Sequence, residues 1–143
     1  MDINGKEIEP KIANLVSLLN KVNYLETISS CHGHFPKEIE LEEDHAIEVD
    51  QYAHVIFDIP DNKEKEFENL IYRIQSQTSL DWCDYNLEIS KRYFCIPHSD
   101  ELSHNWQLKI TPFMPNDYTS EEKREITGKA IFKLENILED YLL

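Results

Sequence analysis

The sequence predicts an α+β fold in which helices pack on one face of a mainly antiparallel sheet of about four strands. Segments with helical spacing of apolar residues alternate with segments of strand period, and a short turn joins two of the strands. A hairpin is antiparallel, and strands with one polar face need helices on one side only. The chain has 143 residues, enough for one hydrophobic core, so we expect a single domain over residues 1–143.

The first half of the chain contains a helix and the clearest strand. Apolar residues recur at helical spacing over residues 10–20, and Pro10 suits the first helical turn, where its missing N–H is not needed. Residues 24–30 favour a short strand. Apolar side chains alternate strictly between residues 51 and 59, which predicts a strand with one face in the core.

Two strands in the second half are expected to form a hairpin. They cover residues 87–96 and 105–111, and the short turn between them favours antiparallel pairing. The alternation of side chains is interrupted near Ser90, which predicts a β-bulge there. Trp106 falls on the apolar face of its strand, and we expect both Trp82 and Trp106 to be core aromatic residues.

Two further helices are predicted from capping residues and apolar stripes. Asp61 or Asn62 can cap a helix that ends near residue 75. The last helix begins near Thr119, because Thr119 and Glu122 have the spacing of a capping box. Its wide apolar face is expected to pack on the sheet, and any part left over would form a homodimer contact.

The composition limits the classes of protein and of partner. The net charge is −14 and 41% of the residues are apolar, which indicates a folded acidic protein and makes a nucleic acid a poor electrostatic partner. No apolar run has the length of a membrane span, and the first seven residues lack the apolar stretch of a secretory signal. Three widely spaced cysteines do not suggest a disulfide framework. We therefore expect a cytoplasmic protein that does not contact membranes.

Residues 28–36 concentrate chemically active side chains where a predicted strand ends. The stretch contains a thiol, two imidazoles, two hydroxyls and a glycine, which favours a tight turn. Backbone N–H groups around such a turn can hold an anion, while hydroxyls and imidazoles contact the rest of a ligand. The predicted ligand-binding residues are Ser29, Ser30, Cys31, His32, Gly33, His34 and His54.

Two pairs of cysteine and histidine suggest zinc as an alternative. Cys31 and His34 form one Cys-x-x-His pair and Cys95 and His98 form another. Two thiolates and two imidazoles are a common tetrahedral donor set for zinc. The simpler alternative is that Cys95 is a buried strand residue and His98 a turn residue. Free cysteines are among the most often buried residues, so we expect Cys31 to be a buried thiol rather than a nucleophile. No catalytic residue is therefore assigned.

The polar face of the sheet is a further candidate surface. His54, Asp58, Arg92 and Lys109 would converge there if the strands paired in chain order. The alternative is that these four are ordinary solvent-facing residues, as expected on the open side of an antiparallel sheet.

The range 12–34 resembles the start of the tRNA wybutosine-synthesising methyltransferase family, and the likeness extends over about the first 60 residues. The family carries Thr-x-Ser-Ser-Cys-Ser-Gly-Arg after a similar helix, and His34 stands here in place of the arginine. The matching residues are Thr27, Ser29, Ser30, Cys31 and Gly33. Small, mostly uncharacterised bacterial and phage proteins with a Ser-Cys-x-Gly-His stretch, followed by a strand like residues 52–57, resemble this chain more closely. The resemblance to the methyltransferase family implies S-adenosylmethionine as the cofactor and methylation of a modified guanosine in tRNA as the activity.

Two functions are expected from these observations. The first is a ligand-binding domain that uses the loop from Ser29 to His34 to bind a small molecule, as a degenerate relative of the tRNA-modifying methyltransferases. The second is a non-enzymatic acidic module that binds a basic protein, as inhibitors and immunity proteins do. In that case residues 38–50, with seven carboxylates and no lysine or arginine, would steer the partner. The sequence alone does not decide between an enzyme and a binding protein.

Overall fold

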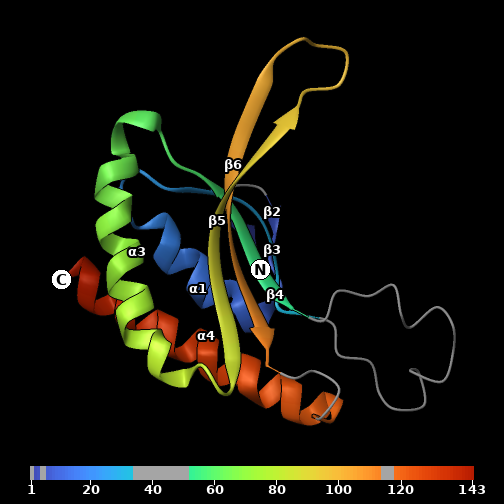
Figure 1. The fold of residues 1–143 in the computed structure, drawn as a ribbon, viewed down its shortest axis with the longest axis vertical. Helices are drawn as coiled ribbons and strands as arrows, with labels where there is room; N and C mark the ends of the chain where they lie inside the picture. The colour runs from blue at the N-terminus through green and yellow to red at the C-terminus, as the bar shows by residue number, and fades with distance from the viewer. Residues whose placement is uncertain (1, 4–5, 34–51, 114–117) are drawn as a thin grey trace, which may run out of the picture.

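In the part of the chain that the computed structural model describes, three helices lie on one face of a four-stranded antiparallel sheet, which confirms the predicted fold class (Figure 1). The structure describes residues 2–3, 6–33, 52–113 and 118–143. Its helices are α1 (Pro10–Asn20), α3 (Glu64–Thr78) and α4 (Ser120–Leu142), with the 3₁₀ turns η2 (Asp61–Lys63) and η3 (Ser79–Asp81).

The strands of the main sheet lie in the order β3-β4-β6-β5, and every neighbouring pair is antiparallel. Two short strands, β1 and β2, pair with each other outside this sheet. The strand bounds are β1 (Asp2–Ile3), β2 (Lys6–Glu7), β3 (Glu26–Cys31), β4 (Ala53–Asp58), β5 (Tyr85–Cys95) and β6 (Leu102–Pro112). Because β6 lies between β4 and β5, the strands do not pair in chain order.

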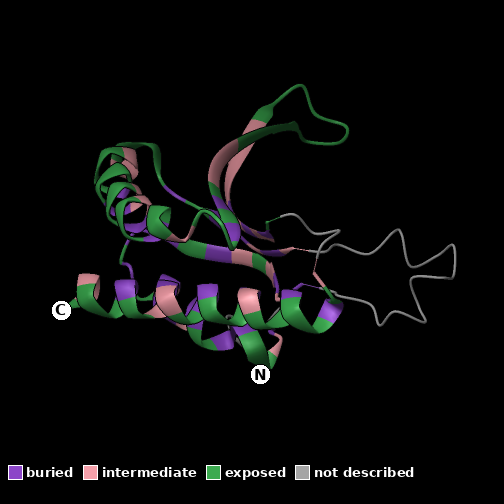
Figure 2. Ribbon diagram, turned by 60° about the horizontal axis from the view of Figure 1, so that its bottom comes forward, coloured by how far each residue is buried: buried purple, intermediate pink, exposed green. Residues whose placement is uncertain are grey.

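Buried residues of the helices and the sheet form one hydrophobic cluster, and Figure 2 marks the buried positions along the ribbon. Alternate residues of β4, namely Ala53, Val55 and Phe57, face this core, as the alternation in the sequence predicted. Phe67 on α3 contacts Phe57 and Trp106 edge to face, with ring centroids 5.4 and 5.0 Å apart. These aromatic contacts attach α3 to the middle of the sheet.

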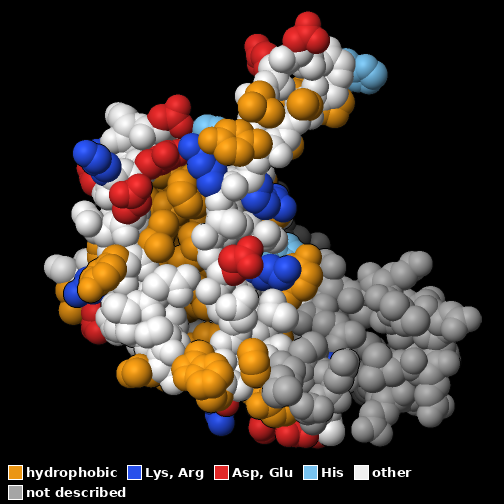
Figure 3. All heavy atoms as spheres, in the orientation of Figure 1, with side chains coloured by type: hydrophobic (Ala, Val, Ile, Leu, Met, Phe, Trp, Pro, Cys, Tyr) orange, Lys and Arg blue, Asp and Glu red, His pale blue; other side chains and the backbone are white. Residues whose placement is uncertain are grey.

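The hairpin of β5 and β6 extends beyond the rest of the sheet (Figure 1). The pairing of β4 with β6 ends at Phe57 and Trp106, so residues 92–105 form a two-stranded arm. Hydrophobic side chains are visible along this arm in Figure 3. Those exposed to solvent are Tyr93, Phe94, Ile96 and Leu102.

The prediction of a β-bulge near Ser90 is wrong. The pairing of β5 with β6 runs without a shift from Tyr85 to Cys95. The alternation weakens after Ile89 because the arm leaves the core, and a strand without a buried face has no reason to alternate. A shift in pairing occurs instead in β3, between Thr27 and Ser29.

The capping prediction is confirmed at α4 and wrong at α3. The Thr119 hydroxyl accepts the Glu122 N–H at 3.1 Å, and the Glu122 carboxylate accepts the Thr119 N–H at 3.3 Å. Asp61 and Asn62 instead lie in the turn η2, and neither caps α3, which continues to Thr78. An intervening 3₁₀ turn moved the start of the helix past both candidate caps.

One expectation about apolar side chains is wrong, because Trp82 was expected in the core and lies at the surface. Trp82 is 65% exposed, and its ring stacks edge-on against Phe113 at the surface. Trp106 is partly buried against the core. Most of the apolar face of α4 packs in the core, as predicted, while Ile126, Tyr141 and Leu142 are partly buried. The homodimer contact through this helix stays a prediction. Within the described ranges, no helix combines the length and apolarity needed to cross a membrane.

An ion pair joins α4 to the turn η3 and predicts a pH-dependent contribution to stability. The Asp81 carboxylate accepts hydrogen bonds from Lys133 Nζ at 2.7 Å and from the Tyr85 hydroxyl at 2.8 Å. The bond from Lys133 is the main cause that holds the pKa of Asp81 below its ordinary value of 3.8. A carboxyl group with a lowered pKa stabilises the fold above its unfolded-state pKa, and this contribution disappears as pH falls through the folded-state pKa.

We expect Lys133→Met to lower the free energy of unfolding near pH 7, where Asp81 is charged. The difference from the native chain should shrink as pH falls below about 4, because protonated Asp81 no longer gains from the ammonium group. Urea denaturation between pH 7 and pH 3 measures this difference, with Lys129→Met on the same helix as control. A difference that stays constant with pH would mean that only the packing of the lysine stem matters.

Candidate functional site

The stretch from Ser29 to His34, which was expected to be a loop, begins inside β3, because this strand continues to Cys31. The structure describes the stretch as far as Gly33, and His34 lies outside the described residues. Gly33 has φ of 96°, in the left-handed region, which confirms the turn expected at this glycine. Its N–H donates to Cys31 Sγ at 3.4 Å. Cys31 is 8% exposed, in agreement with its prediction as a buried thiol.

The loop residues face two different sides of the sheet. Ser29 pairs with Ile56 and Cys31 pairs with His54, which places both on the face away from the helices. Ser30 pairs with Val55 and therefore faces the helices, where its hydroxyl has no hydrogen-bond partner among the described residues. The predicted ligand-binding residues therefore do not all gather at one site.

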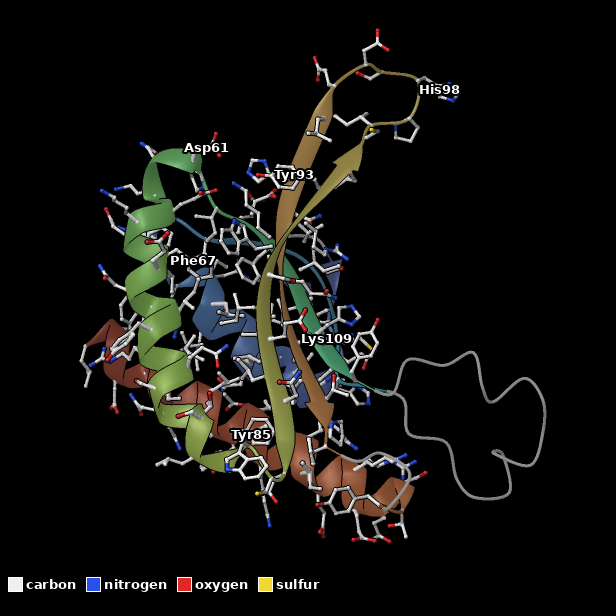
Figure 4. The ribbon with its side chains drawn as sticks, viewed as in Figure 1. Asp61, Phe67, Tyr85, Tyr93, His98 and Lys109 are labelled. Carbon is white, nitrogen blue, oxygen red and sulfur yellow. The ribbon has the colours of Figure 1, made fainter. Side chains whose placement is uncertain are left out.

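On the outer face, Cys31, His54, Lys109 and Glu88 occupy neighbouring positions across the four strands. The Lys109 ammonium lies 4.2 Å from the centre of the Tyr52 ring, which in turn lies 5.6 Å from the ring of His54. Figure 4 shows Lys109 near the middle of the sheet. This row is partly apolar and partly charged, with His54 half-buried at its centre.

The four residues expected on the polar sheet face converge only in part. His54 and Lys109 are cross-strand neighbours. Asp58 lies at the other end of β4, opposite Glu26. Arg92 lies at the base of the arm, where its Nε donates to Asn105 Oδ1 at 3.2 Å. Asp58 and Arg92 are exposed, as the alternative of solvent-facing residues predicted.

The two cysteine–histidine pairs are not brought together. Cys31 is aligned across the sheet with Glu88, and Cys95 lies seven residues further along β5. At about 3.3 Å per residue, this separates the two cysteines by roughly 23 Å, whereas ligands of one zinc ion must all lie about 2 Å from the metal. Cys95 is exposed, and His98 lies in the hairpin turn with φ of 62° (Figure 4). The expectation that Cys95 is buried is therefore wrong, and His98 is a turn residue.

A cavity of about 290 Å³ lies on the helical side of the sheet, next to the end of β3. We call it the α1–α4 cavity, because α1, α4 and the two residues after β3 form its walls. The described residues that line it are Lys11, His32, Gly33, Arg124, Thr127, Gly128 and Ile131. Two of the predicted loop residues, His32 and Gly33, thus belong to a cavity that the sequence did not reveal.

Glu9 holds the loop at the edge of this cavity. Glu9 precedes the first turn of α1 but does not cap its own helix with its side chain. Its carboxylate accepts the backbone N–H of His32 at 3.3 Å and contacts Nδ1 of the His32 ring. The negative charge of Glu9 therefore offsets any positive charge on His32, and the start of α1 is joined to the end of β3.

The lining of the α1–α4 cavity has an unusual polarity for this chain. Its described residues include Lys11 and Arg124, and no aspartate or glutamate is found among these described residues, although the chain has 28 acidic and 14 basic residues. Thr127 is 2% exposed, and its hydroxyl has no hydrogen-bond partner among the described residues. One turn earlier on α4, Lys123 is also buried, and burial lowers its pKa.

Sequence reasoning missed the cations of this cavity because each lies on a helix whose apolar stripe dominates the pattern. One local signal was present at Lys11, which lies in the first turn of α1. The positive end of the helix dipole disfavours a cation there. A lysine at such a position is therefore a candidate for a role outside helix stability.

A second polar cluster lies where α3 begins, close to the base of the arm. The ligand atoms of Asp61, Glu64 and His104 lie within 4.8 Å of one another, a grouping that can hold a divalent cation. Lys91 already places its ammonium 2.7 Å from Glu64, and this contact is the main cause that raises the pKa of Lys91. The His104 ring lies 3.3 Å from Asp61. These contacts form an ion-pair network that joins η2 and α3 to the hairpin.

No family model, curated protein or solved structure matches this chain. Function is therefore inferred from the cavity and from the residues that line it.

Proposed function

We propose that this chain is a ligand-binding domain that holds a small molecule in the α1–α4 cavity. The observation that carries the proposal is the buried hydroxyl of Thr127, which has no hydrogen-bond partner in the described part of the chain and lies in the wall of a cavity that His32 and Gly33 also line. A buried polar group without a partner destabilises a fold by about 1–3 kcal/mol. A ligand that accepts a hydrogen bond from this hydroxyl would remove that penalty.

The size and position of the cavity also support small-molecule binding. Ligand sites usually measure about 300–1,000 Å³, and this cavity of about 290 Å³ lies just below that range, as suits a small ligand. The resemblance to the wybutosine-synthesising methyltransferases makes S-adenosylmethionine one compound to test. The proposal itself concerns binding and assigns no catalytic residue.

Gly128 offers a direct test, because it lines the cavity and a Cβ atom added there would meet no atom within 4 Å. A helical side chain lies over the preceding turn, so a leucine at this position would cover Arg124 and fill the rim of the cavity. We expect Gly128→Leu to fold and to lose ligand binding. In thermal-shift titrations of S-adenosylmethionine, nucleotides and small carboxylates, a true ligand raises the native Tm by roughly 5–10 °C at a hundredfold excess over Kd.

The matched control is Gly128→Ala, which leaves the rim open. We expect this variant to keep ligand binding and to be more stable by about 0.5–1 kcal/mol, because alanine is a better helix former than glycine. A ligand that shifts the Tm of Gly128→Leu as much as that of the native chain does not bind in this cavity. That result would contradict the proposal.

The acidic protein-binding module is the second candidate, and the arm is the observation that favours it. Four large apolar side chains of the arm are between 38% and 65% exposed, and clustered exposed apolar residues are typical of protein contacts. Residues 38–50, which were expected to steer a basic partner, lie outside the described residues. A native chain that no small molecule stabilises would favour this second function.

A further inference from the structure

We infer that two copies of this chain associate through their arms, with the outer edge of one β5 strand paired antiparallel to the outer edge of the other. A two-fold axis relates the two arms in this arrangement, and the two sheets join into one. The inference concerns the arm and is independent of ligand binding in the α1–α4 cavity.

The backbone of β5 is the first argument, because this strand ends the sheet and none of the described strands pairs with its outer edge. The Ile96 N–H donates to the Glu101 carbonyl at 3.2 Å, so the even-numbered residues of β5 form the hydrogen bonds with β6. The odd-numbered residues direct their N–H and C=O groups outward. Gln75 agrees with this direction, since its Nε2 donates to the outward carbonyl of Leu87 at 3.2 Å. Beyond Leu87, the outward positions are Ile89, Lys91, Tyr93 and Cys95.

The usual protection of a free edge is weak in β5. Proteins protect such edges with β-bulges or with lysine side chains that stand on the edge. The pairing of β5 with β6 runs without a shift from Tyr85 to Cys95, so the edge is regular. The ammonium group of Lys91 lies 2.7 Å from the Glu64 carboxylate, which draws it toward α3 and away from the edge. A regular edge of this kind is a template for another strand.

The exposed apolar side chains of the arm are the second argument. Tyr93 is 61% exposed and Phe94 is 43% exposed, and as neighbours in a strand they face opposite sides of the arm. Pairing of two β5 edges places each ring beside side chains of the other arm, and aromatic cross-strand pairs stabilise a sheet. Association would therefore bury apolar surface on both faces of the arm.

Charge identifies a second copy of this chain as the partner. The whole chain has a net charge of −14, whereas residues 91–105 contain two basic and two acidic residues and are neutral. The arm extends four residues beyond the pairing of β6 with β4, which is roughly 14 Å. Repulsion between exposed charges is screened over about 8 Å at physiological salt. Contact through the arms therefore keeps the two acidic bodies apart (Figure 1).

The order of charges along the arm fixes its orientation. The basic residues Lys91 and Arg92 lie at the base of the arm, and the acidic residues Asp100 and Glu101 lie at its tip. Antiparallel pairing places the tip of each arm beside the base of the other, so opposite charges come together. Like charges directly opposite each other destabilise a sheet, so the two-fold axis passes at Tyr93 or nearer the tip.

Sedimentation equilibrium and amide hydrogen exchange of the native chain test the pairing without any substitution. In the monomer, the even-numbered amides of β5 are bonded to β6 and exchange slowly, while the outward amides of Ile89, Lys91, Tyr93 and Cys95 exchange rapidly. We expect exchange of these outward amides to slow by about tenfold at concentrations where sedimentation shows mostly dimer. Outward amides that exchange equally fast in monomer and dimer would overturn the inference.

Substitutions on the arm test the side-chain contacts. We expect Phe94→Ser to raise the dissociation constant of the dimer about tenfold or more. The matched control is Phe132→Ser, which removes an equally large ring that is 64% exposed on α4 and should leave the dissociation constant unchanged. Circular dichroism melts confirm that both variants are folded.

Charge reversal tests the orientation of the two arms. Arg92→Glu and Glu101→Arg should each weaken the dimer about fivefold, and the double variant should regain most of the native affinity, because base and tip then exchange their charges. Single reversals that dimerise as tightly as the native chain would overturn the inference. A native chain that stays monomeric at its highest soluble concentration would also overturn it, and would leave the arm to a different protein, as in the second candidate function.

Discussion

Replacing Phe67 with alanine is expected to lower the free energy of unfolding by about 3–5 kcal/mol, the range typical of large aromatic residues deleted from a core. Phe67 is 2% exposed and is the residue through which α3 meets the aromatic rings of Phe57 and Trp106 (Figure 4). Alanine would lose both ring contacts and leave a cavity between helix and sheet. Urea denaturation followed by circular dichroism measures the loss.

Tyr72→Ala is the matched control for this experiment. Tyr72 lies on the same helix and is 77% exposed, so its removal should change stability by no more than about 0.5 kcal/mol. The two variants change aromatic content equally and differ mainly in burial. A loss below about 1 kcal/mol for Phe67→Ala would contradict the packing of α3 against the sheet.

Asn20→Ala should destabilise the chain by about 2–3 kcal/mol, because the amide side chain joins α1 to β3 by hydrogen bonds. Its Oδ1 accepts the backbone N–H of Thr27 at 3.0 Å. Its Nδ2 donates to the Thr27 hydroxyl at 2.8 Å and to the Val16 carbonyl at 3.1 Å. Thr27 is 4% exposed and lies where the pairing of β3 with β4 shifts, so water could not readily replace the lost partner.

Two comparison variants identify the cause of this loss. Asn20→Asp keeps the acceptor for the Thr27 N–H but loses the donor, and we expect a smaller loss than for alanine. Asn23→Ala replaces an exposed asparagine just beyond α1 and should have an effect within about 0.5 kcal/mol. Equal losses for Asn20→Ala and Asn23→Ala in urea denaturation would show that the contacts with Thr27 do not stabilise the fold.

Features that depend on a few neighbouring residues could be predicted from the sequence. The capping box of Thr119 and Glu122, the turn at Gly33 and the buried face of β4 all follow from local chemistry or from a period of two. The prediction near Ser90 was wrong, because the same loss of alternation that a bulge produces also marks a strand that leaves the core. Local pattern does not distinguish these two causes.

The candidate site was predictable only in part. The sequence directed attention to the stretch from Ser29 to His34, of which His32 and Gly33 line the cavity. Ser29 and Cys31 face the other side of the sheet, since neighbouring residues of a strand alternate in direction. Lys11 and Arg124 belong to helices that are distant in the sequence, so no local motif could show that they share a cavity.

The sequence by itself determined the class of fold, the approximate helices and strands, and the turn that ends β3, because periodicity, capping and glycine chemistry act over a few residues. Only the tertiary structure decided that β6 lies between β4 and β5, that the hairpin projects as an arm, and that Lys11 and Arg124 line the same cavity as Thr127. The choice of neighbouring strands and helix faces depends on the packing free energy of the whole chain. A cavity is what that packing leaves unfilled, and it becomes visible only when all its walls are in place.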